Sequence, residues 1–163
     1  MLLFTIPQFS SNQNDGPMQK MCHYSRMQQE DLKMLCTIVE YLKGNFQVGL
    51  DRQDVKKYSG KLAMINNHQN KRYEGIDALI NENIFQMKKG KTLDNTVLLY
   101  GKEVRKLESG LRTLKLFVCD AIEMLSEDNV GENRSEERIR YFESRSPTLE
   151  SEISILSNQL SKL

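Results

Sequence analysis

The chain has 163 residues, 23 Lys and Arg against 22 Asp and Glu, and 39% hydrophobic residues, so its length fits one domain of ordinary size. Its three prolines leave residues 18–146 without any. This disfavours an all-β fold, which needs a turn about every 8–12 residues. The composition also excludes collagen, a transmembrane span and a small disulfide-stapled protein. It favours helices.

The cysteines and histidines predict neither a metal site nor a cofactor site. Cys22, Cys36 and Cys119 are widely spaced, and neither His23 nor His68 belongs to a set with the spacing of metal ligands. Free thiols are typical of a reducing compartment, so we expect a cytoplasmic or nuclear protein.

The chain begins with an apolar stretch, MLLFTIP, followed by polar, turn-rich residues. The stretch has no basic residues before it and is shorter than the core of a secretory signal. We expect residues 1–20 to be a flexible segment whose apolar start docks on this chain or on another protein.

Residues 26–47 have the pattern of an amphipathic helix. Leu32, Leu35, Val39 and Leu42 recur at intervals of three and four, and a second apolar stripe lies beside the first. Two stripes bury more surface than a two-stranded coil requires, so this helix is expected to pack against more than one neighbour.

Residues 51–126 are predicted to form a long coiled coil. Asp51 has the position of an N-cap residue. From Val55 onward, apolar residues occupy 16 of 21 heptad a and d positions, which we call the seam. β-branched residues at a with Leu at d favour a parallel dimer. The predicted oligomerisation residues, where the seam is unbroken, are Val97, Tyr100, Val104, Leu107, Leu111, Leu114, Val118 and Leu125.

The seam weakens in its middle, where Asn83, Gln86 and Gly90 replace hydrophobic residues. The heptad phase agrees on both sides, which favours a continuous but softened helix; the alternative is a hairpin or bundle broken near Gly90. Arg72, at a d position, is interpreted as a break in packing or a contact to a third chain.

Residues 127–146 are rich in charge, Ser and Asn and are predicted to be a linker. Ser146 and Pro147 then have the positions of N-cap and first residue of a short helix over 147–163. Because so short a helix is marginal alone, its apolar stripe predicts partner binding. The stripe consists of Leu149, Ile153, Leu156, Leu160 and Leu163.

Three serines in acidic or Ser-Pro contexts, Ser126, Ser135 and Ser146, are candidate phosphorylation sites. The Gly90-Lys91-Thr92 run lacks the earlier glycine and the strand of a phosphate-binding loop. No residues have a catalytic arrangement recognisable from the sequence, so we expect a protein that is not an enzyme.

These patterns predict an all-α fold of elongated helices and a non-enzymatic scaffold or subunit. Its expected partners are a second copy or another coiled-coil protein, without membrane insertion or a small-molecule substrate. By analogy with other helical rods, chromosome segregation, spindle or centrosome assembly and meiotic chromosome structure are the expected settings. A trafficking tether or SNARE-associated coil is one alternative. A nucleic-acid adaptor is another, disfavoured because residues 51–126 carry only 14 basic against 10 acidic groups.

Overall fold

The computed structural model describes residues 16–90, 95–126 and 133–163, and four helices contain nearly all of them. They are α2 (Gly16–Asn45), α3 (Arg52–Lys88), α4 (Asn95–Leu125) and α5 (Asn133–Ser161). The prediction of an all-α fold is confirmed.

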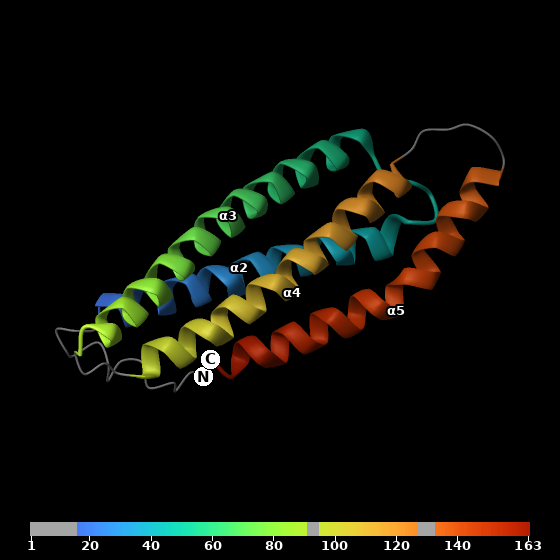
Figure 1. Cartoon of the computed structure of the whole chain (residues 1–163). Coiled ribbons are helices and arrows are strands. Elements are labelled where there is room, and N and C mark those ends of the chain that lie inside the picture. The colour runs from blue at the N-terminus through green and yellow to red at the C-terminus, as the bar shows by residue number, and fades with distance from the viewer. Residues whose placement is uncertain (1–15, 91–94, 127–132) are drawn as a thin grey trace.

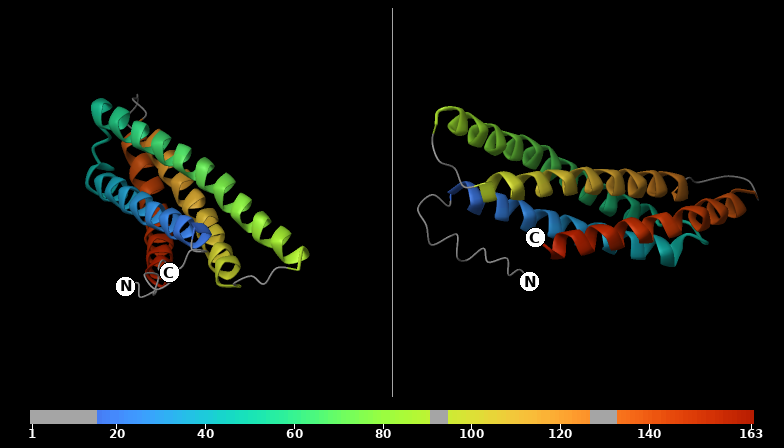
Figure 2. Two further views of the ribbon diagram at one scale, coloured as in Figure 1. Left: turned by 90° about the vertical axis from the view of Figure 1, so that its left-hand side faces the viewer. Right: turned by 60° about the horizontal axis from the view of Figure 1, so that its bottom comes forward.

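The helices alternate in direction and form a bundle with a rhombic arrangement. α2 and α4 lie together in the middle, α3 packs against both on one side, and α5 packs against both on the other (Figure 1). α2 is therefore antiparallel to α3 and α5, and so is α4. One end of the bundle holds the start of α2, the end of α3, the start of α4 and the end of α5 (Figures 1 and 2).

The start of α3 follows the prediction. The Asp51 side chain accepts a hydrogen bond from the backbone N–H of Gln53 at 2.9 Å, as an N-cap does. Just before it, Gly49 has a φ of +90°, a conformation that glycine adopts without steric cost. The chain thus leaves α2, turns and caps α3 within a few residues.

The preferred continuous helix over 51–126 is wrong, and the alternative broken near Gly90 is correct. α3 ends at Lys88, and Gly90 has a φ of +78° with its N–H bonded to the Met87 carbonyl. The weak seam explains this, because Asn83 and Gln86 supply no apolar contact that would hold a helix together through a glycine. Residues 91–94 lie outside the described residues.

The eight predicted oligomerisation residues are all buried within this single chain. Each has less than a tenth of its surface exposed, against neighbours on α2, α3 and α5. The two halves of the seam meet in antiparallel order inside the chain. Seven-residue periodicity indicates that one face of a helix is buried, but it does not identify the helix that covers this face.

The predicted linker over 127–146 is also wrong for its second part, because α5 begins at Asn133 and continues to Ser161. Ser146 does not cap a helix, and Pro147 lies inside α5. Proline removes one backbone hydrogen bond and typically kinks a helix, and α5 changes direction partway along its length in Figure 1. The charge-rich composition concealed a helix whose buried Phe142 packs on the core.

The C-terminal stripe predicted to bind a partner packs on the chain's own core. Leu149, Leu156 and Leu160 are buried there, and Ile153 and Leu163 are partly buried against it. These residues are therefore part of the bundle's own core, and their binding to a partner stays a prediction.

α2 begins ten residues before the predicted helix, at Gly16. Pro17 lies in its first turn, where proline is tolerated, and Met18, Met21 and Cys22 are buried. The first part of the predicted N-terminal segment, residues 1–15, lies outside the described residues.

Candidate functional site: a buried ionic layer and an exposed helix end

The apolar core is divided into two clusters. The larger contains Leu35, Leu111, Leu114 and Leu156, among others, and the smaller contains Met18, Met21, Ile76, Ile80 and Val104. Five buried polar or charged side chains separate the clusters, and we call them the ionic layer. The ionic layer consists of Gln28, Asp31, Gln69, Arg72 and Glu108.

Arg72 is the centre of the ionic layer. Its guanidinium is fully buried, and its Nε and Nη2 donate to the two carboxylate oxygens of Glu108 at 2.7 and 3.0 Å. Its Nη1 lies 2.7 Å from Oδ2 of Asp31. Burial acts to lower the pKa of Arg72, but the hydrogen bonds and charge of Glu108, together with Asp31, outweigh it and raise that pKa. Arg72 therefore stays charged.

Two further side chains complete the contacts around these carboxylates. The Gln28 amide donates to the Val104 carbonyl at 2.9 Å and to Glu108 at 3.0 Å. His68, at the half-exposed edge, has its Nδ1 3.1 Å from Oδ1 of Asp31. The layer thus joins α2, α3 and α4 by charge. Sliding one helix by a residue would separate Arg72 from its carboxylates, so the layer holds these helices in register.

The charged groups of the ionic layer pair with one another. Arg72 cannot give up its proton, and its two carboxylate partners are bound to it. In the described part of the chain, no group of three or more His, Cys, Asp and Glu residues could hold a metal ion. Burial raises the pKa of the Cys22 thiol, with opposing effects from Tyr100 and Arg26, so this cysteine is poorly suited as a nucleophile.

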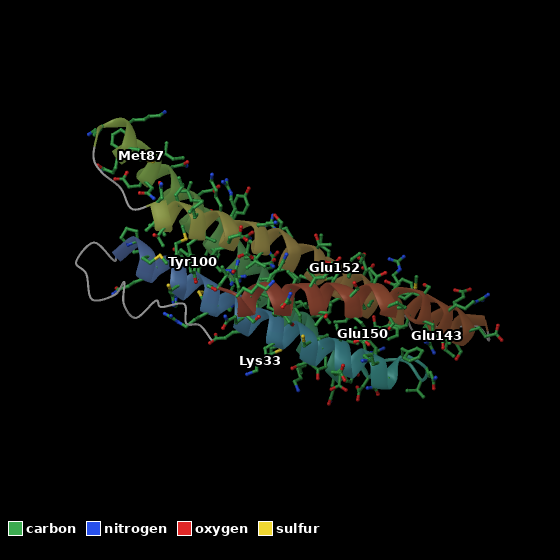
Figure 3. The ribbon with its side chains drawn as sticks, turned by 90° about the horizontal axis from the view of Figure 1, so that it is seen from below. Lys33, Met87, Tyr100, Glu143, Glu150 and Glu152 are labelled. Atoms are coloured by element: carbon green, nitrogen blue, oxygen red, sulfur yellow. The ribbon has the colours of Figure 1, made fainter. Side chains whose placement is uncertain are left out.

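The second unusual region is the end of α3, which we define as residues 81–89. Ile80 is the last buried residue of α3, and the helix continues for two more turns. Figures 2 and 3 show these turns diverging from α2 and α4, with Met87 at the tip. Ile84, Phe85 and Met87 are 37%, 49% and 46% exposed.

At the α3 end two polar side chains are half-buried, while apolar side chains are exposed together with charged ones. The half-buried Asn83 Nδ2 and Gln86 Oε1 have no hydrogen-bond partner in the described residues. On the outside, Lys89 lies over the Phe85 ring with its Nζ 4.5 Å from the centroid, and Lys88 is exposed beside it. The α3 end therefore offers apolar contact and positive charge together.

The predicted phosphorylation sites are dispersed. Ser135 is exposed near the start of α5, Ser126 is half-buried after α4, and Ser146 is half-buried within α5. They do not form a common surface with the α3 end, and their modification stays a prediction.

Sequence reasoning singled out Arg72 but missed its partners. The break in packing predicted at this position is wrong, because Arg72 is among the most buried side chains. Gln28 and Asp31 continue the apolar stripe of α2 toward its start, and Glu108 directly follows the seam residue Leu107. Their positions on or beside buried helix faces were the only sign in the sequence that these residues could be partners of Arg72.

Searches against protein-family models, curated proteins and solved structures find no match to this chain. None of the helices in the described residues is long and apolar enough to span a membrane.

Proposed function

We propose that this protein is a non-enzymatic helical subunit that binds a partner protein through the α3 end. The observation that carries the proposal is the exposure of Ile84, Phe85 and Met87 beyond the last buried residue of α3. Ile84 and Met87 are three residues apart, a spacing that helix-to-helix recognition uses, and Phe85 adds apolar surface beside them.

The charge of the α3 end defines the chemistry of the partner. Lys88 and Lys89 are exposed at its tip, and Glu82 is bonded to Gln86 within the same helix. We infer that the partner is a helix whose apolar stripe is flanked by Asp or Glu. Apolar burial would supply affinity, and the lysines would steer the encounter and set orientation.

The test compares two exposed-surface variants in a quantitative co-purification. Ile84→Ser with Met87→Ser is expected to lose the partner, whereas Ile155→Ser, at a position 48% exposed on α5, is expected to keep it. Carbodiimide crosslinking, which joins amines to carboxylates, should then link Lys88 or Lys89 to acidic residues of that partner. Equal recovery of all partners by both variants would contradict the proposal.

The biological setting stays a prediction, and the identity of the captured partner tests it. Spindle or chromatin proteins would support a role in cell division, and vesicle proteins would support the trafficking alternative. Salt-sensitive binding to a DNA probe without any protein partner would favour the nucleic-acid adaptor.

A further inference from the structure

An open groove lies on the described surface between α2 and the C-terminal part of α5. Its volume is about 750 Å³. Leu32, Cys36 and Leu160 form its apolar part, and Ser157 and Ser161 leave room because they are small. Arg26, Glu30 and Lys33 also line it. Lys33 is labelled on α2 in Figure 3.

We propose that residues 1–6 of the same chain bind in this groove. These residues, Met-Leu-Leu-Phe-Thr-Ile, are apolar at five of six positions and lie outside the described residues. They are followed by a polar stretch over 7–15 that joins them to α2. An apolar segment tethered beside an apolar groove loses little entropy on binding compared with a free peptide.

The length of the chain fits this assignment. Along α2, Arg26 lies about 15 Å and Cys36 about 30 Å from Gly16, at 1.5 Å per residue. The nine residues 7–15 span up to about 30 Å when extended. Residues 1–6, which extend to about 20 Å, can therefore start near Arg26 and run toward Cys36. In that direction Leu3 comes close to Cys36.

Tethering also sets the expected occupancy. A short flexible linker gives an effective concentration of about 1 mM, so an intrinsic affinity of about 0.1 mM leaves the groove open roughly a tenth of the time. The segment would then shield Cys36, whose thiol pKa is already raised, by burial first and by the charge of Glu40 second.

The first experiment is disulfide trapping in the full chain. Leu3→Cys is combined with Cys22→Ala and Cys119→Ala, so that Cys36 is the other thiol, and the dilute protein is oxidised by glutathione disulfide. We expect a disulfide between positions 3 and 36 within one chain, identified by mass after digestion. The matched control moves the second thiol one residue along α2, by Cys36→Ala with Thr37→Cys, because Thr37 is exposed and does not line the groove.

Three results of this trapping would overturn the proposal. They are a disulfide yield no higher than in the Thr37→Cys control, a disulfide-linked dimer as the main product, and no disulfide at all. The dimer would assign the groove to the segment of a second copy.

A second measurement avoids engineered thiols. Leu2→Asp with Leu3→Asp should speed alkylation of Cys36 by roughly tenfold, because the segment no longer covers the groove. Cys119, which is also half-buried but lies on α4, should react at an unchanged rate. An unchanged rate at Cys36 would overturn the proposal. Because neither experiment involves the α3 end, their failure would leave the proposed function standing.

Discussion

The ionic layer and the α3 end depart from ordinary protein architecture in opposite directions. The ionic layer places one cation and two anions, Arg72, Asp31 and Glu108, where the core should be apolar. The α3 end exposes Ile84, Phe85 and Met87 where the surface should be polar. The buried charges have partners on neighbouring helices, whereas the exposed apolar side chains lie beyond the last buried residue of α3.

This difference separates residues that specify the fold from residues available for binding. Buried ion pairs add little to stability, because desolvation offsets their attraction, but they penalise every arrangement that separates them. Exposed apolar side chains cost little when isolated and become useful when a partner covers them. Mutations in the two regions should therefore differ sharply in their effect on the free energy of unfolding.

The largest effect is expected for Arg72→Met. It leaves the carboxylates of Asp31 and Glu108 buried without a counter-charge, which should lower the free energy of unfolding by about 3–5 kcal/mol. Urea denaturation at neutral pH measures this decrease in the free energy of unfolding. The triple variant Arg72→Met, Asp31→Leu, Glu108→Met removes all three charges and should match or exceed the wild-type stability. If Arg72→Met alone were as stable as the wild type, Arg72 would not be buried among these groups.

The next effect concerns the packing of α2 against α3. A Cβ at Gly75 would lie 2.7 Å from Cζ of Tyr24 and still closer to its hydroxyl. Gly75→Ala should therefore destabilise the protein by about 1–3 kcal/mol through overpacking. Gly60→Ala is the control on the same helix, because a Cβ there meets nothing within 4 Å. It should instead gain up to about 1 kcal/mol of stability from helix propensity. If Gly75→Ala and Gly60→Ala changed the free energy of unfolding in the same direction, that result would contradict the close approach of Tyr24 to Gly75.

These packing relations mark the limit of what the sequence could predict. The heptad pattern correctly predicted the apolar stripe of α4 that is buried, since all nine of its described seam positions lie in the core. It did not predict what covers them, because a neighbouring helix of the same chain and a second copy impose the same periodicity. The Arg72–Glu108 pair was beyond prediction for a related reason, since it depends on the antiparallel register that the turn at Gly90 creates.

A smaller gain in stability is expected for Gln69→Leu. Both polar atoms of the Gln69 side chain are buried and have no hydrogen-bond partner in the described residues. Replacing this unsatisfied amide at a seam position should raise the free energy of unfolding by about 1 kcal/mol. Destabilisation of the same size would mean that Gln69 bonds to a buried water or to a bound partner.

The smallest effect on stability is expected for Phe85→Ser. Phe85 is half-exposed and contacts Lys89 of its own helix, so its loss should change the free energy of unfolding by less than about 0.5 kcal/mol. The same urea titration checks this. A loss of 2 kcal/mol or more, about the cost of an apolar core truncation, would place the α3 end in the core and remove the basis for a docking element.

The central claim, that the seam closes within one chain, is tested most directly by one distance. Spin labels at Ser59→Cys and Glu123→Cys, in a chain with Cys22, Cys36 and Cys119 changed to Ala, report on α3 and α4 at positions that line the same surface depression. Dilution with unlabelled protein removes distances between chains. Helices packed about 10 Å apart should give a label separation below roughly 30 Å. A continuous helix would place the labels about 96 Å apart, and that result would contradict the folded-back bundle.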